Sequence, residues 1–434
     1  MTKQSSQTEY IVSKRPADGT MIEAVMRPEG STALAVARAG QVEIVEKLQL
    51  DGMTYLPIPA RNNLLWHRVV LLPPLPADPV DPRDLVRDIT DFVTRYVTFS
   101  DGFLIVAVHY VLLSWVYDAF RELPYLRVRG DYGSGKTRAL QVIGHLLYKP
   151  VFASGATTVS PIFHTLDLFR GSLVLDEADF RFSDQTAELT KILNNGNAEG
   201  FPVLRSVPND KKLYDPRAFA VYGPKLIAMR EFWHDQALES RCLTETMWIA
   251  PLRSGVPITL PKEFAEEATA LRAKLLAYRF YTLPTLLASS VIYDADLSPR
   301  MNQLLTSLLA CATNDTDRSA IIAFAAEQER EAMSATAFRP ESYVLGAIGA
   351  LHAKQAGSIP LADVRRYLTR HHGAEFDRPI TARYVGQLVR AKLNLPTKKS
   401  HGTFKVLVSE ERLHALNLRF GVDKVDGVDI GDDT

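Results

Sequence analysis

One stretch constrains the fold of this chain more than any other: residues 126–140, "LRVRGDYGSGKTRAL". It lies between an apolar run and a helical pattern, and it satisfies G-x-x-x-x-G-K-[ST] at Gly130, Gly135, Lys136 and Thr137. Glycines let successive backbone N–H groups point inward around an anion, and the N-terminus of the following helix adds partial positive charge. The stretch therefore predicts a strand, a phosphate-binding loop and a helix. The alternative is a glycine-rich turn that only caps a helix.

A loop of this kind predicts a role for each of its side chains. Lys136 is expected to reach the β- and γ-phosphates of a nucleotide, and the Thr137 hydroxyl is expected to bind Mg²⁺. The other predicted nucleotide contacts come from the loop itself, at Gly130, Gly133, Ser134 and Gly135. Kinases, GTPases and motors all use such a loop, so a second motif is needed to separate them.

The second motif is the segment 172–177, "SLVLDE", an apolar run that ends in two acids. Asp176 is expected to position Mg²⁺ through its water shell, and Glu177 is expected to orient and polarise the attacking water. A lone Asp-Glu pair indicates only a strand-end turn, whereas the pair together with the loop predicts nucleotide hydrolysis. No N-K-x-D-like segment that would select guanine is apparent, so ATP and Mg²⁺ are the expected ligands.

Strand and helix patterns alternate between residues 124 and 255, which predicts an α/β core: a parallel sheet with helices on both faces. A chain of 434 residues is too long for one ordinary domain. The remaining patterns predict a small β-rich N-terminal domain (1–80), a helical linker (81–123), an α-helical lid (256–338), a separate C-terminal module (339–421) and an acidic tail expected to be disordered (422–434).

The composition of the chain limits which partners and which cellular compartment can be expected. Lys plus Arg and Asp plus Glu balance at 50 each, so a nucleic-acid surface must come from local clustering of charge. Cys242 and Cys311 have no neighbours at metal-ligand spacing, which argues against disulfides and zinc and fits a reducing cytoplasm. The polar start has no signal-peptide core, and the apolar run 103–117 is shorter than the roughly 20 residues of a membrane span. We expect a buried helix there and no membrane partner.

Downstream of the Asp-Glu pair, a further apolar run at 224–229, "PKLIAM", is followed by Ser240-Arg241-Cys242. With these motifs, residues 124–330 resemble the AAA+ ATPases, in which a phosphate loop, a strand ending in Asp-Glu, a sensor strand and an arginine finger follow one another. The resemblance implies that Arg241 reaches the γ-phosphate held by a neighbouring subunit. It therefore also implies a homo-oligomeric ring, commonly a hexamer. A salt bridge at a helix end is the alternative role for Arg241.

The sequence departs from the family pattern at the sensor strand. The polar residue expected there falls near Met229, whose thioether cannot bind phosphate or water strongly. Arg230 is the candidate substitute, and slow hydrolysis is the other consequence to expect. Arg300, at the start of a predicted lid helix, resembles a sensor-2 arginine that contacts the nucleotide; an ordinary helix-start arginine is the alternative.

A predicted hairpin indicates contact with DNA. Runs of strand type at 201–207 and 217–222 flank a turn that carries Lys211 and Lys212. The segment resembles the hairpin that helicases of the superfamily 3 and minichromosome-maintenance type project into the channel of their ring. Two lysines at an exposed turn are also typical of an ordinary solvated surface.

The C-terminal module resembles a winged helix, with helices at 341–354, 361–372 and 381–393 and a β-wing at 396–408. Residues 378–408 contain no acid and seven basic side chains, and clustered Lys and Arg are what phosphate binding requires. The predicted DNA contacts are Arg383, Gln387 and Arg390 on one face of the third helix, and Lys398 and Lys399 on the wing. A winged helix that binds only protein is the alternative.

Together these motifs predict an ATP-dependent DNA translocase or helicase, of the sort that phages, plasmids and integrated elements carry for replication. The main alternative is a DNA-bound ATPase switch that recruits or loads a partner without unwinding, as in initiator loading, transposition control or phage defence. A transcriptional regulator is a weaker alternative. A small-molecule kinase is disfavoured, because such an enzyme excludes water rather than activating it with Glu177.

Overall fold

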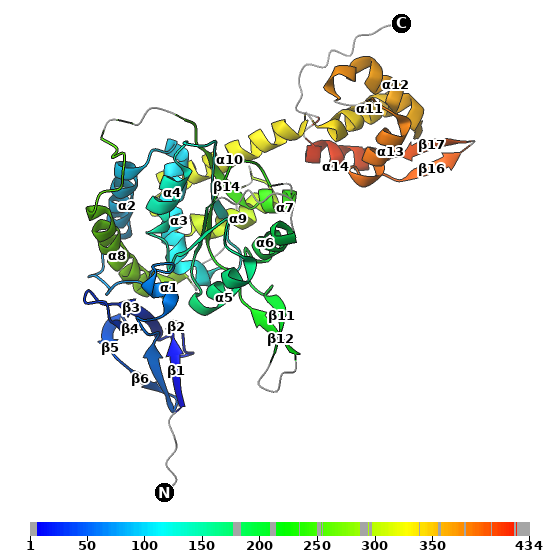
Figure 1. The fold of residues 1–434 in the computed structure, drawn as a ribbon. Helices are drawn as coiled ribbons and strands as arrows, with labels where there is room; N and C mark the ends of the chain where they lie inside the picture. The colour runs from blue at the N-terminus through cyan, green and yellow to red at the C-terminus, as the bar shows by residue number, and fades with distance from the viewer. Residues whose placement is uncertain are drawn as a thin grey trace. The chain divides into compact units, whose positions relative to one another are not determined.

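The structure is a computed structural model, and it describes residues 7–176, 184–208, 214–233, 235–249, 253, 255–286, 294, 297–337, 339–354, 357–376, 379–400, 402–420 and 422. The chain forms two compact units, Met1–Ala325 and Ala326–Thr434 (Figure 1). Helix α10 (Asp315–Ala337) spans the boundary between them.

Five parallel strands form the central sheet of the first unit, in the order β14-β8-β13-β10-β9. The strands are β8 (Tyr125–Arg129), β9 (Val151–Ser154), β10 (Leu173–Asp176), β13 (Lys225–Met229) and β14 (Cys242–Thr246). Helices connect them, as parallel strands require: α4 (Lys136–Gly144), α5 (Val159–Phe169), α6 (Asp184–Asn195) and the short α7 (Gln236–Glu239). The predicted α/β core with a parallel sheet is confirmed.

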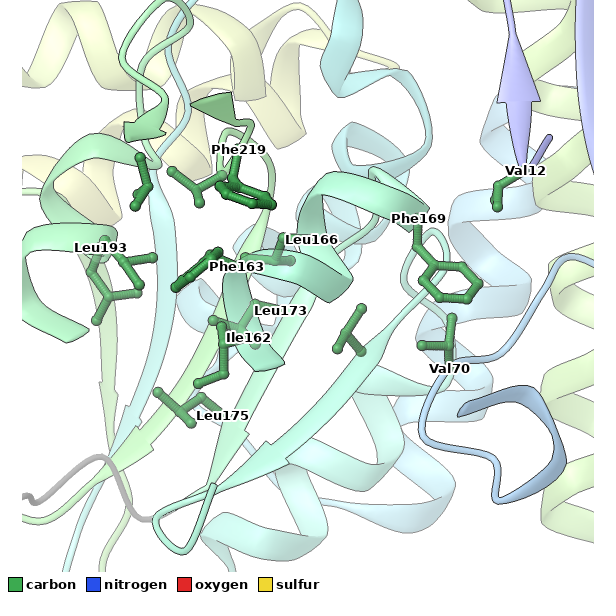
Figure 2. Close-up of a cluster of buried hydrophobic side chains, with 14 of the residues drawn as sticks. Val12, Val70, Ile162, Phe163, Leu166, Phe169, Leu173, Leu175, Leu193 and Phe219 are labelled. Atoms are coloured by element: carbon green, nitrogen blue, oxygen red, sulfur yellow. The ribbon is translucent and has the colours of Figure 1, made fainter. Parts of the chain in front are cut away.

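The helices cover both faces of this sheet because strand side chains alternate in direction. Leu173 and Leu175 of β10 belong to the cluster that contains Phe163 and Leu166 of α5, as Figure 2 shows. Val174, between them, faces α4, where a Cβ on Gly144 would lie 3.2 Å from its methyl groups. β10 is therefore buried on both faces, which explains its wholly apolar run before Asp176.

The N-terminal region is β-rich, as predicted, and it shares its core with the sheet. Its strands are β1 (Gln7–Ile11), β2 (Ser13–Lys14), β3 (Met21–Met26), β4 (Thr32–Arg38), β5 (Gln41–Val45), β6 (Leu48–Leu50) and β7 (Met53–Pro57), and the short helix α1 (Asn63–Trp66) follows. Four strands form an antiparallel sheet, β2-β3-β4-β5, and the other three form the sheet β1-β7-β6. Val12 and Val70 belong to the same buried cluster as Phe169 of α5 (Figure 2).

A buried ion network adds a polar connection between this region and the rest of the unit. Glu23 of β3 lies 2.6 Å from Lys149 Nζ and 2.9 Å from Arg279 Nε, and all three side chains are buried. Arg279 also pairs with Asp118, at 2.7 Å. Removing one partner of such a network leaves an uncompensated buried charge, which is strongly destabilising. The N-terminal strands are therefore fixed to this unit by both apolar and ionic contacts.

Further helices complete the first unit: α2 (Pro82–Tyr96), α3 (Asp101–Val116), the 3-10 turn Tyr117–Ala119, α8 (Glu263–Leu286) and α9 (Pro299–Leu309). By length and hydropathy the segment Asp101–Ala119 is apolar enough to cross a membrane, but most of it is buried inside the unit. Tyr110 and Trp115 are fully buried, and Trp115 Nε1 donates to Leu146 O at 2.8 Å. The prediction of a buried core helix is confirmed.

The predicted hairpin is present as β11 (Val203–Pro208) and β12 (Tyr214–Phe219), which pair antiparallel. The predicted strands began and ended within a few residues of these bounds. Lys211 and Lys212 lie outside the described residues.

The second unit combines helices with a small antiparallel sheet, β15-β17-β16. Its elements are α11 (Pro340–Lys354), β15 (Ser358–Pro360), α12 (Leu361–His371), the 3-10 turn Gly373–Glu375, α13 (Ala382–Ala391), β16 (Thr397–Ser400), β17 (Thr403–Leu407) and α14 (Glu410–Phe420). A separate apolar core, which includes Leu345, Val364, Val389 and Val406, holds them together. β15 has three residues, too few to show a period in the sequence, and it was not predicted.

Candidate functional site

The glycine loop follows β8 at the carboxyl edge of the parallel sheet, where ligands bind in open α/β folds. A Cβ on Gly130 would lie 2.2 Å from Met247 O, so no other residue fits there without moving backbone. Gly133 and Gly135 have φ of +73° and +95°, in the left-handed region that favours glycine. The close approach at Gly130 and the positive φ at Gly133 and Gly135 explain why the loop has glycine at these three positions.

Lys136 lies folded over this loop. Its Nζ donates to Gly130 O at 2.6 Å and to Asp131 O at 2.7 Å. These carbonyl contacts keep the ammonium group at the mouth of the loop, where a phosphate oxygen can compete with the carbonyl oxygens for it.

The first residues of α4 and the end of β10 meet at the candidate metal site. Thr137 Oγ1 donates to Asp176 Oδ2 at 3.0 Å, which brings together the two side chains predicted to hold Mg²⁺. A hydroxyl and a carboxylate are hard oxygen donors that fit Mg²⁺, which usually takes few protein ligands and completes its shell with water and phosphate. Among the residues that the structure describes, no group of three or more His, Cys, Asp or Glu side chains could hold a metal ion. Glu177 lies outside the described residues.

Strand β13 ends at Met229, which is buried in the sheet. Its Sδ lies 3.8 Å from the guanidinium of Arg127, so the thioether faces the interior and not the loop. The next side chain, Arg230, lies over the ring of Tyr132 in the glycine loop, with 3.7 Å from its guanidinium carbon to the ring centroid. The structure thus places the candidate substitute, Arg230, against the glycine loop.

Sequence reasoning missed the chain segment that follows β14. β14 ends at Thr246, and the apolar residues 247–249 that follow it pass beside the loop, where Met247 N donates to Arg129 O at 2.6 Å. Trp248 is 77% exposed there, and Arg138 of α4 donates to Pro257 O at 3.0 Å, further along the same segment. An apolar run has the same appearance whether it is buried in a strand or exposed beside a site, so the sequence held no signal for this difference.

Arg241 lies at the other edge of the sheet. It precedes β14, and its carbonyl accepts from Tyr125 N, at the amino end of β8, at 2.8 Å. A five-residue strand is about 16 Å long, which separates Arg241 from the glycine loop of its own chain. Arg241 Nη1 donates to Asn194 Oδ1, and Asn194 Nδ2 donates in turn to Asp235 Oδ2 at 2.7 Å.

Arg300 lies with Arg241 and not with the glycine loop. It begins α9 beside Glu122, three residues before β8, at 3.7 Å from Glu122 Oε2. Burial, and then the nearby charge of Arg241, lower the pKa of Arg300, while Glu122 raises it. The two arginines therefore form one positively charged patch at the amino edge of the sheet, and the structure does not bring Arg300 to the nucleotide site of its own chain.

The predicted basic surface of the second unit is exposed as expected. Arg383, Gln387 and Arg390 lie on the outer face of α13, whose inner face carries the buried Val385 and Val389. Lys398 and Lys399 are exposed on β16. All five side chains belong to the second unit, and none is part of its apolar core.

No protein-family model matches the chain, and no curated protein matches it. Among solved structures, the chain is similar to the apo A form of the NrS-1 C-terminal region, residues 305–718, with a TM-score of 0.36 and 11% identity. That match covers 89% of this chain and 96% of the other.

Proposed function

We propose that the chain is an ATP-dependent DNA translocase or helicase. The observation that carries the ATPase is the hydrogen bond between Thr137 and Asp176, which joins the glycine loop to the strand end that bears Glu177. In this proposal Lys136 neutralises the phosphates, Thr137 and Asp176 hold Mg²⁺, and Glu177 orients water for attack. Bound Mg²⁺ would supply charge neutralisation on the phosphates.

In this proposal several copies of the chain form a ring, and six copies is the common number in rings of this kind. Arg241 lies about one strand length from the loop of its own chain, so a role at a γ-phosphate requires the loop of a neighbouring subunit. Burial lowers the pKa of Arg300, and the nearby charge of Arg241 lowers it further. In the proposed ring, these two neighbouring arginines would face the same adjacent subunit. Two cations at one interface fit the charge that develops on a transferring phosphoryl group.

DNA would be held by the second unit and moved by the first. In the second unit, α13 and the ribbon of β16 and β17 would act as the recognition helix and wing of a winged helix, with contacts from Arg383, Gln387, Arg390, Lys398 and Lys399. The hairpin β11–β12 would carry Lys211 and Lys212 into the channel of the ring, and the helices after residue 256 would act as its lid. Replication of a mobile element is the setting we propose.

The test is the ATPase rate with no DNA, single-stranded DNA and duplex DNA, alongside particle mass. The proposal expects a multi-subunit particle whose ATPase is stimulated by DNA, is absent in Lys136→Ala and is absent in Glu177→Gln. Lys136→Ala should also lose ATP binding, whereas Glu177→Gln should keep it, because phosphate capture and water activation are separate roles. Equal loss of ATP binding in both variants would refute the two assignments.

A second experiment separates the two DNA-contacting elements. Replacing Lys398 and Lys399 with alanine should weaken DNA binding and reduce the slope of log K against log salt by roughly one to two units. ATPase without DNA should stay unchanged. Replacing Lys211 and Lys212 should leave DNA binding largely intact but remove DNA stimulation. A wing variant that binds DNA like the parent would contradict the assignment of the second unit.

Met229 favours a second candidate function, a DNA-bound ATPase switch that recruits or loads a partner. Its thioether faces Arg127 and cannot polarise water or phosphate, which fits slow turnover with a long-lived ATP state. DNA-stimulated ATPase without strand separation would favour this candidate.

A further inference from the structure

The β16–β17 ribbon carries an aromatic side chain whose position the core does not explain. Figure 1 shows the two strands extending from the helices of the second unit. Lys399 pairs with Phe404, and Thr397 pairs with Val406. Because side chains alternate along a strand, Phe404 shares a face with Val406, and Lys399 shares it with Thr397.

This face changes from buried to exposed along the ribbon. Val406 is 0% exposed and belongs to the core of the unit, whereas Phe404, two residues nearer the turn, is 46% exposed. The core-facing side of the ribbon therefore continues past the core, and Phe404 is the apolar side chain that it presents to solvent.

The exposed face is continuous with the outer surface of α13. Arg390 Nη1 donates to Thr397 Oγ1 at 3.4 Å, where helix and ribbon meet. Further along the ribbon, Lys399 Nζ lies 5.9 Å from the centroid of the Phe404 ring. The surface thus runs from Arg390 through Thr397 to Lys399 and Phe404.

The charged side chains around Phe404 indicate which class of ligand this surface would bind. Lys398 and Lys405 pair on the opposite face of the ribbon, so cations lie on both faces of the ribbon around Phe404, and residues 379–408 contain no acid. An aromatic ring among cations binds single-stranded nucleic acid, because bases stack on the ring while phosphates meet the charges. Bases in the interior of a duplex are stacked on both faces, so a long duplex presents free base faces to such a ring only at its two ends.

We propose that Phe404 is a stacking platform for an unpaired DNA base, with Lys398, Lys399 and Lys405 holding the flanking phosphates. The ribbon then distinguishes single strands and tails from blunt duplex, while the outer face of α13 binds the DNA backbone in either form. This inference rests on the proposed DNA binding of the second unit and adds a preference for unpaired bases.

The test is equilibrium binding of the full chain to an oligothymidylate and to a blunt duplex, at several salt concentrations. Phe404→Ala should weaken oligothymidylate binding by about tenfold, the effect expected when one base loses its stacking partner. Duplex affinity should change less than about twofold, and the salt slope should stay at the parental value because no cation is removed. Phe404→Tyr keeps the ring and should restore binding.

Leu407→Ala is the matched control. Leu407 is an exposed apolar residue of the same strand, 39% exposed, and it points to the opposite face from Phe404. Its replacement should leave both affinities unchanged.

Three results would overturn the inference: Phe404→Ala binds oligothymidylate like the parent, it loses duplex binding equally, or Leu407→Ala produces the same loss. If the parent binds DNA and Phe404→Ala has no effect, only this inference is contradicted. If the parent binds neither the oligothymidylate nor the duplex, the proposed function is contradicted as well.

Discussion

The hydroxyl of Thr137 donates to Asp176 Oδ2 at 3.0 Å, so the start of α4 and the end of β10 meet through one pair of oxygens. Both oxygens lie at the carboxyl edge of the sheet, next to the loop that Lys136 covers. This contact connects two motifs that are far apart in the sequence.

Asp176→Asn should remove the contribution of Mg²⁺ to ATP binding. The amide can still accept from Thr137, so the loop should keep its shape, but it no longer carries the charge that holds the metal's water shell. We expect the ATP affinity of the variant in Mg²⁺ to equal the affinity measured in EDTA, whereas the parent should bind more tightly in Mg²⁺. A variant that keeps the full Mg²⁺ effect would show that Asp176 does not serve the metal.

Alanine at two loop glycines should have unequal effects. At Gly130 a Cβ would lie 2.2 Å from a backbone carbonyl, so Gly130→Ala must displace the loop or the segment at Met247. At Gly133 a Cβ meets nothing within 4 Å, and the cost is only the positive φ, about 1–2 kcal/mol. We expect loss of ATP binding in Gly130→Ala and a modest loss in Gly133→Ala, measured by nucleotide titration. Equal affinities in the two variants would contradict the close approach of Met247.

The loop, the acidic strand end and the hairpin could be predicted because each depends on neighbouring residues. The motif at Gly130 specifies its own strand–loop–helix context, and alternating patterns specify a parallel sheet. The spacing of Arg383, Gln387 and Arg390 likewise predicted that they share one face of the third helix, and all three are exposed on α13.

The sequence did not predict which residues far apart in the chain contact each other. Glu and Lys side chains are usually exposed, so the sequence does not mark Glu23 and Lys149 as buried. They form a buried pair because the fold brings these distant residues together. For the same reason, the helix-start pattern at Arg300 predicted a helix but not its position beside Arg241. Periodicity specifies the face of an element, whereas the neighbour of that face depends on the tertiary fold.

Arg241→Ala should lose ATPase activity, by about 10³-fold or more if it acts as an arginine finger, while each subunit still binds ATP. Mixing it with Glu177→Gln protein should restore some activity, because some interfaces then pair an intact Glu177 with an intact Arg241. The measurement is steady-state ATPase across mixing ratios. No recovery when subunits demonstrably exchange would contradict a shared site.

Lys225 should make stability depend on pH. Its Nζ is buried 2.9 Å from each of three carbonyl oxygens, those of Gly196, Val221 and Gly223. Burial lowers the pKa of Lys225 from 10.5 to about 7. Between these two values the unfolded chain binds more protons, so the free energy of unfolding should rise with pH, by at most about 1.4 kcal/mol per unit.

Lys225→Met removes the titrating group and should remove this rise. The measurement is denaturant unfolding of parent and variant at pH 6, 8 and 10. The difference in unfolding free energy, parent minus variant, should increase between pH 8 and pH 10. A difference that does not change with pH would show that Lys225 keeps its ordinary pKa when folded.

The central claim is that ATP hydrolysis at this site moves the protein along DNA, and strand separation on a forked duplex tests it most directly. The parent should release the labelled strand only with ATP and Mg²⁺. Glu177→Gln, which is expected to bind ATP without turning it over, should bind the fork and release nothing. If the parent hydrolyses ATP in response to DNA yet leaves both the fork and a bound roadblock protein in place, the claim of translocation is contradicted and the switch is the function that remains.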